Sequence, residues 1–198
     1  MLGCSSSTDK IDLGQFQNSV YHNRFFGLTV TIPSGWTVAD SGSTKQAMDV
    51  GKKLVTGKDN SMQAVYDLAE QQTVNLFMVS KHPLGAPVNV NPNMLLVAEK
   101  VGQVPGIKTG ADYLFHAKRL LQDSALKFTM TQDISTKSIA GKPFGVMRLD
   151  LNVGKTIVHQ TYFVVVDTGY ALAFTASYGN DDDAAALDDM IGSITFSR

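Results

Sequence analysis

The sequence predicts an α+β domain in which helices pack on a mainly antiparallel β-sheet. Two observations carry this expectation. In the C-terminal half, apolar residues largely alternate with polar or small ones along three successive segments, 147–153, 156–166 and 170–178, which is the periodicity of strands. The turns between them are short, at Gly154-Lys155 and at 167–169, and short turns join antiparallel strands. Segments with helical spacing lie outside this run of strands, which favours the α+β class.

Size and charge limit the possible classes of protein. A chain of 198 residues is long enough to fold as one domain with a sizeable core. Its formal net charge is −1 and it has no basic stripe, which argues against nucleic acid as a partner. No apolar run approaches the roughly 20 residues that span a bilayer. Cys4 is the only cysteine, which excludes an internal disulfide and a zinc site built from several thiolates.

The first predicted strand runs from Phe26 to Ile32, where large apolar residues alternate with glycine and threonine. It ends at Pro33, because proline has no N–H to donate to a sheet. Before the three strands of the C-terminal half, further strands are predicted at 73–80, 94–101 and 126–134.

Helical spacing of apolar residues predicts four helices. They are expected at about 44–55, 61–71 and 111–123, and after Asn180. Ser43 or Thr44 is predicted to cap the first helix by accepting hydrogen bonds from its first turn. The acidic run Asp181–Asp183 would lie at the positive end of the last helix, where carboxylates are stabilising.

Leu2, Gly3 and Cys4 resemble the last positions of a bacterial lipoprotein lipobox, in which a small residue precedes an acylated cysteine. The resemblance implies that Cys4 becomes the mature N-terminus, carries acyl chains such as palmitate, and anchors the protein in a membrane. No basic and apolar signal-peptide regions precede these residues, and an intact precursor would have both. The alternative interpretation is a free cysteine at a cytosolic N-terminus.

The lipoprotein resemblance also implies a location and a domain organisation. An acylated Cys4 places the protein on the extracytoplasmic side of a bacterial cell envelope. A serine after the acylated cysteine, here Ser5, resembles outer-membrane cargo facing the periplasm if the cell is Gram-negative. The polar stretch Ser5–Asn18 is expected to be a flexible tether. The chain then divides into a lipobox remnant and tether at residues 1–19 and a single domain at 20–198.

Four segments of that domain, taken together, resemble the PsbP-like family. They are the strand and turn at 23–36, the helix with Tyr113-Leu114, the strand at 169–176, and the final helix and strand at 190–196. The resemblance covers roughly Val20–Phe196 and implies an αβα sandwich around an antiparallel sheet. It also implies a binding or assembly role, since the family includes extrinsic photosystem II subunits, a Ran-binding import factor and bacterial lipoproteins. These segments are structural, so no functional residue carries over.

Sequence motifs for catalysis and metal binding are missing. There is no Gly-x-Ser-x-Gly, and Gly154-Lys155-Thr156 lacks the upstream glycine of a P-loop. Helix capping explains the acidic run Asp181–Asp183 without a calcium site. The histidines lack the spacing of metal ligands; they are His22, His82, His116 and His159. We therefore expect no enzymatic activity, no metal and no cofactor.

Polar residues on two neighbouring strands form a possible binding face. Period two predicts that Arg148 and Asp150 share one side of their strand, and that His159 and Thr161 share one side of the next. The simpler interpretation is a solvated face with cross-strand pairs of at most about 1 kcal/mol each, because half-exposed antiparallel sheets need polar residues outside. The alternative is that these four side chains bind a partner.

The sequence thus favours a membrane-tethered, non-enzymatic module that binds or assembles with another envelope protein. The membrane would be reached through acylated Cys4. A second hypothesis is a small-ligand carrier with a pocket between the helices and the sheet. The eight methionines and ten phenylalanines would line such a pocket, although core packing is their commoner use.

Overall fold

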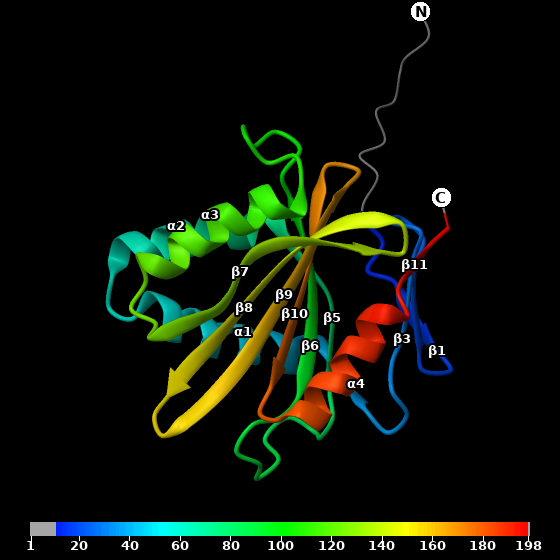
Figure 1. Ribbon diagram of the computed structural model, residues 1–198, viewed down its shortest axis with the longest axis horizontal. Helices are drawn as coiled ribbons and strands as arrows, with labels where there is room; N and C mark the ends of the chain where they lie inside the picture. The colour runs from blue at the N-terminus through cyan, green and yellow to red at the C-terminus, as the bar shows by residue number, and fades with distance from the viewer. Residues whose placement is uncertain (1–10, 198) are drawn as a thin grey trace, which may run out of the picture.

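The computed structural model describes residues 11–197 and confirms the α+β class, with helices on a strongly twisted antiparallel sheet (Figure 1). The helices of this part of the chain are α1 (Ser41–Thr56), α2 (Asn60–Gln72), α3 (Gly110–Gln122) and α4 (Asp181–Gly192). The first six strands are β1 (Gln15–Gln17), β2 (Val20–Asn23), β3 (Leu28–Thr31), β4 (Thr37–Val38), β5 (Thr73–Ser80) and β6 (Asn93–Lys100). The others are β7 (Phe128–Ile139), β8 (Lys142–Val153), β9 (Thr156–Asp167), β10 (Tyr170–Tyr178) and β11 (Thr195–Phe196).

The strands form two sheets. The large sheet has the order β4-β5-β6-β10-β9-β8-β7, and the small sheet has the order β1-β2-β3-β11. Every pairing within them is antiparallel. Strands β7 to β10 are joined in sequence by hairpins, as the short turns predicted. The long return of the chain brings β6 beside β10 in the middle of the sheet.

Each face of the large sheet carries its own buried core. On one face, Leu172 and Phe174 of β10 pack with residues of β2, β3 and α4. On the opposite face, Ala171 and Ala173 of β10 belong to a core that includes Leu114 of α3. The alanines on this side of β10 leave room for a helix to approach the sheet closely. The small sheet and α4 therefore form one outer layer, and α1, α2 and α3 form the other.

Helix α3 approaches the sheet closely at two glycines. A Cβ atom added to Gly110 would lie 1.8 Å from the carbonyl oxygen of Val164 in β9, and one added to Gly145 in β8 would lie 2.5 Å from the N atom of Ala111. Such distances leave no room for a side chain. These two glycines let the start of α3 rest directly on the strand backbones.

The structure corrects the prediction that the first strand begins at Phe26. Two earlier strands, β1 and β2, pair as a hairpin through Asn18 and Ser19, whose φ angles of 49° and 60° form the turn. Phe16 of β1 packs against the core. The predicted tether Ser5–Asn18 is therefore wrong in its second half, because a single apolar residue among polar ones is enough for a short edge strand.

The predicted cap of the first helix is also wrong. Asp40 is the N-cap of α1, and its carboxylate accepts a hydrogen bond from the N–H of Ser43 over 2.7 Å. Ser43 and Thr44 lie inside the helix. The physical role expected of a cap is filled, but one turn earlier. No helix of the described residues is both long and apolar enough to cross a membrane.

Candidate functional site

The four residues of the predicted binding face meet on adjacent strands of the large sheet. Arg148 of β8 lies opposite Thr161 of β9, and Asp150 lies opposite His159. Even-numbered residues of β8 and odd-numbered residues of β9 point to the face that carries α4, as Phe144 and Phe163 of that core show. The side chains thus form two neighbouring cross-strand pairs on one surface.

Hydrogen bonds order part of this surface. His159 Nδ1 lies 2.6 Å from Asp150 Oδ1, and both side chains are partly exposed. Thr161 is buried, and its hydroxyl lies 3.5 Å from the hydroxyl of Tyr178 in β10. The ring of Tyr178 lies beside that of His159, with the centroids 5.4 Å apart. Three strands therefore contribute to the surface, and Tyr178 is the member that sequence reasoning missed.

Arg148 is the residue of this surface that lacks a complete set of partners. Its Nε atom is buried and has no hydrogen-bond acceptor among the described residues. Buried donors are nearly always satisfied in proteins, so Nε is an exception. The side chain as a whole is half-buried and forms no ion pair with another described residue, so its charge is free to pair with a group from outside the chain. A guanidinium group matches the geometry of carboxylate and phosphate oxygens. The surface can therefore offer a charged donor beside an ordered His–Asp pair.

The surface is partly exposed: the side chains of His159 and Asp150 are 36% and 26% exposed, whereas Thr161 is buried. Helix α4 starts after β10, and an ion pair of 2.7 Å between Asp183 and Lys81 holds its first turn near the end of β5. In Figure 1, β8 and β9 continue past α4 toward the lower left of the view. We refer to the surface of Arg148, Asp150, His159, Thr161 and Tyr178 as the polar face.

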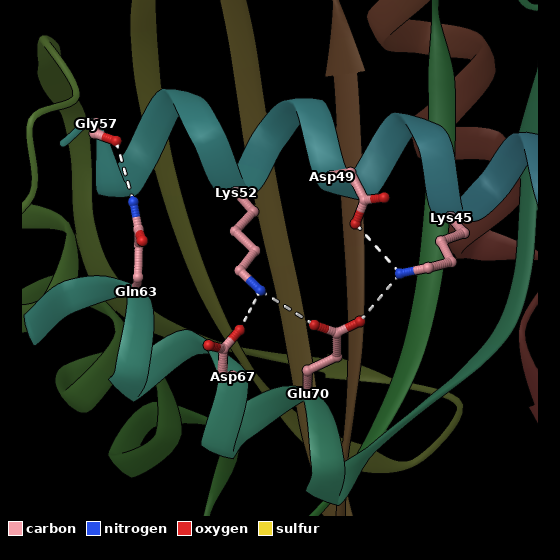
Figure 2. A network of polar contacts seen from close by, with 7 residues as sticks. All are labelled: Lys45, Asp49, Lys52, Gly57, Gln63, Asp67 and Glu70. Atoms are coloured by element: carbon pink, nitrogen blue, oxygen red, sulfur yellow. Dashed lines mark hydrogen bonds and ion pairs between the residues drawn. The ribbon is translucent and has the colours of Figure 1, made fainter. Parts of the chain in front are cut away.

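A second polar cluster joins α1 to α2 (Figure 2). Lys52 forms ion pairs with Asp67 and with Glu70, the latter at 3.2 Å, and Lys45 bridges Asp49 at 3.3 Å and Glu70 at 3.5 Å. The carboxylate groups are about half exposed or more, so each pair contributes little, typically about 0–1 kcal/mol. The cleft of about 320 Å³ beside it is lined mainly by charged side chains. This cluster orients the two helices against each other.

The space between α2, α3 and the sheet is filled by tyrosines. Burial raises the pKa of Tyr113 well above its usual value and also raises that of Tyr162 and of Tyr66. The hydroxyl of Tyr113 donates to Glu99 Oε2 over 2.6 Å, and that of Tyr162 donates to Gln160 Oε1 over 2.6 Å. These tyrosines stay neutral at physiological pH and act as packed donors. The tyrosine side chains lie between the helices and the sheet, which is where the carrier hypothesis predicts a ligand pocket.

Among residues 11–197, no group of three or more His, Cys, Asp or Glu side chains is arranged to hold a metal ion. Of the acidic run, Asp183 is buried and pairs with Lys81. Asn180 caps α4 by accepting a hydrogen bond from the N–H of Asp183. Cys4 lies outside the described residues.

Comparison with solved structures identifies the class of fold. The solution structure of cyanobacterial PsbP (CyanoP) from Synechocystis sp. PCC 6803 matches with a TM-score of 0.55 and 15% sequence identity, over 93% of this chain and 99% of that chain. LpqN, involved in cell envelope biogenesis of Mycobacterium tuberculosis, matches with a TM-score of 0.48 and 14% identity, over 86% and 83% of the two chains. No family model and no curated protein matches the sequence. The protein is an αβα sandwich of the PsbP-like type, which confirms the fold that the sequence resemblance implied.

Proposed function

We propose that this protein is a membrane-tethered module of a bacterial cell envelope, anchored outside the cytoplasm through acylated Cys4, that binds an envelope protein through the polar face. Its role is binding or assembly rather than catalysis. The lipobox-like residues Leu2, Gly3 and Cys4 support the anchor. A PsbP-like domain then acts as the part that recognises a partner.

The observation that carries the binding role is the buried Nε atom of Arg148, which has no acceptor among the described residues. The half-buried side chain has no ion-pair partner among those residues either, and a carboxylate of the partner would pair with the accessible nitrogens of the guanidinium group. The neighbouring His159 and Asp150 already bond to each other, so they present a preformed polar rim. Hydrogen bonds to charged groups contribute about 1.5–3 kcal/mol each, which is enough to make Arg148 the main determinant of affinity.

The carrier hypothesis has less support. The cleft between α1 and α2 is lined mainly by charged side chains, and a second cleft near Asp40 and Pro83 is lined by polar and apolar residues in equal number and by no aromatic one. Ligand pockets are lined mainly by apolar and aromatic side chains. Of the aromatic residues between α2, α3 and the sheet, Tyr113 donates to Glu99 and Tyr162 donates to Gln160.

The anchor is tested by labelling the full-length precursor with an alkyne fatty acid in bacterial cells. We expect label on the wild-type protein and none on Cys4→Ser. Label that persists in Cys4→Ser would contradict acylation at this residue.

The binding role is tested by photo-crosslinking in the same cells. A benzoylphenylalanine at Asn152, an exposed position on the polar side of β8, should form a discrete adduct with one envelope protein. Arg148→Met should weaken this adduct about tenfold or more, whereas Lys58→Met, which removes an exposed cation between α1 and α2, should leave it unchanged. An adduct that survives Arg148→Met at full strength would refute the role of Arg148 in binding, and the absence of any adduct would show that the polar face is only a solvated surface.

A further inference from the structure

The described chain enters the domain at one end of the large sheet, and named contacts fix which end. Asn23 donates through Nδ2 to the carbonyl oxygen of Asp12 over 2.6 Å. Three residues later, the ring of Phe26 lies 5.7 Å from that of Tyr170, measured between centroids. Tyr170 is the first residue of β10. The chain therefore enters beside the β9–β10 turn.

The loop between β6 and α3 lies at this same end. The N–H groups of Val101 and Gly102 both donate to the carbonyl oxygen of Gly169 in the β9–β10 turn, over 2.9 and 2.8 Å. In Figure 1 this loop and this turn project together from the upper end of the sheet. We call the surface formed by residues 11–14, 24–27, 100–112 and 167–169 the entry end.

The entry end exposes apolar side chains together with cations. Leu13 is 55% exposed and Val104 is 43% exposed. Arg24, Lys100 and Lys108 are also exposed, and none of them forms a salt bridge with another residue in the described range. Apolar tips surrounded by basic residues are the composition of surfaces that contact anionic lipid.

The carboxylates of the entry end are largely engaged. Asp112 accepts hydrogen bonds from the N–H groups of Lys108 and Thr109, and Asp167 pairs with Lys142 at 2.8 Å. Asp12 accepts a hydrogen bond from the N–H of Gly14, and neither it nor Asp112 forms a salt bridge with another described residue. Arg24, Lys100 and Lys108 outnumber these two carboxylates, so the net charge of this end is positive.

The opposite end of the sheet carries a run of carboxylates, of which Asp183 is paired with Lys81. Strand β10 runs away from the entry end for nine residues, which is about 30 Å of extended chain, and α4 then opens with Asp181, Asp182 and Asp183. The entry end is therefore the more basic of the two ends, and an anionic surface attracts it more strongly than it attracts the far end.

We propose that the entry end rests on the lipid surface of the membrane, with Val104 and Leu13 at the level of the headgroups and Arg24, Lys100 and Lys108 facing anionic lipids. This rests on the proposed acyl anchor at Cys4. The seven residues from Cys4 to Lys10 span at most about 25 Å, so the anchor keeps this end within reach of the bilayer. The polar face, on β8 and β9 beyond α4, then points into the surrounding solvent where a partner protein can reach it.

The test uses the full chain and does not depend on acylation in cells. The thiol of Cys4, the only one in the chain, is coupled to a maleimide lipid in phosphatidylcholine vesicles that contain phosphatidylglycerol and brominated lipid. In a Trp36→Phe background, a tryptophan introduced by Val104→Trp reports contact with the bilayer. The matched control is Ile157→Trp, an exposed position beside the β8–β9 turn at the far end.

We expect the bromine atoms to quench the Val104→Trp emission at least twice as strongly as the Ile157→Trp emission. Lys100→Glu with Lys108→Glu should abolish the difference, as should high salt, whereas Lys155→Glu at the far end should not. Equal quenching at the two positions, or none at Val104→Trp, would overturn the proposed orientation. That result would leave the fatty-acid labelling of Cys4 intact, while loss of labelling would refute the natural anchor and leave the vesicle result intact.

Discussion

Helix α3 and the α1–α2 hairpin lie on the same side of the large sheet but are held there in different ways. In α3, Gly110 touches strand backbone and Leu114 is fully buried. In α1, the fully buried residues are Thr44 and Thr56, and in α2 only Met62 is buried. Exposed ion pairs join these two helices to each other (Figure 2).

The difference shows that similar sequence periodicity can produce unequal attachment. Both regions have amphipathic helices with good caps, yet Leu54 and Leu68 remain exposed on the hairpin. Buried apolar area is the main source of stability, so α3 should open only with the whole domain. The hairpin should open locally at a lower free energy.

The largest effect is expected from Gly110→Ala. The new methyl group would overlap the carbonyl of Val164 and the backbone of Gly145, so α3 must shift away from the sheet. We expect a loss of more than about 4 kcal/mol in the free energy of unfolding, or failure to fold. The matched change Gly51→Ala in α1 meets nothing within 4 Å and should stabilise the protein by up to about 1 kcal/mol. Denaturant titration measures both, and similar losses would break the contrast.

The next effect comes from truncating a leucine on each region. Leu114→Ala removes a fully buried side chain and should cost about 2–5 kcal/mol. Leu68→Ala removes one that is 63% exposed and should change stability by less than about 0.5 kcal/mol. Thermal unfolding of the two variants beside the wild type gives the comparison. A large loss for Leu68→Ala would mean that apolar contacts attach the α1–α2 hairpin to the domain as firmly as they attach α3.

Low pH should destabilise the α1–α2 hairpin more than α3. Hydrogen bonds from the backbone N–H of Ser43 hold the pKa of Asp40 below its usual value, and those from Met62 do the same for Asp59. Because these pKa values are lowered in the folded state, the capping stabilisation is present above about pH 4 and is lost as the pH falls through the folded values. The Thr109 side chain similarly lowers the pKa of Asp112 at the start of α3.

Burial should nevertheless hold α3 in place when its cap is lost. Between neutral pH and about pH 3 we expect amides of α1 and α2 to lose hydrogen-exchange protection before those of α3. Simultaneous loss in all three helices would show that the hairpin and α3 unfold as one unit.

The sequence was a good guide where structure follows from period and turn chemistry. The short turns at 154–155 and 167–169 fix the register of β8, β9 and β10, so Arg148, Asp150, His159 and Thr161 could be assigned to a shared surface. The same register places Tyr178 opposite His159, and this could have been predicted by counting across the second turn. The buried Nε atom of Arg148 without an acceptor could not have been predicted, because its burial depends on neighbours from separate strands.

Other features depend on contacts between segments that are distant in the sequence. The β1–β2 hairpin was missed because its residues are mostly polar and its turn uses Asn18 and Ser19 without glycine. The contact of Gly110 with β8 and β9 has no local signature, since both glycines lie in ordinary helix-start or strand sequence. The weak attachment of α1 and α2 likewise depends on how few of their side chains are buried, which the periodicity of their sequences does not reveal.

The smallest effect is expected from Lys52→Met, which tests whether the ion pairs of Figure 2 hold the hairpin. The substitution removes the pairs with Asp67 and Glu70 but keeps a long apolar stem. Since both carboxylates are at least half exposed, the free energy of global unfolding should change by less than about 1 kcal/mol. Hydrogen exchange in α1 and α2 should rise severalfold while exchange in α3 stays the same, and Lys58→Met is the control outside the cluster. If exchange in α1 and α2 does not change, contacts with the sheet and not the ion pairs determine how often the hairpin opens.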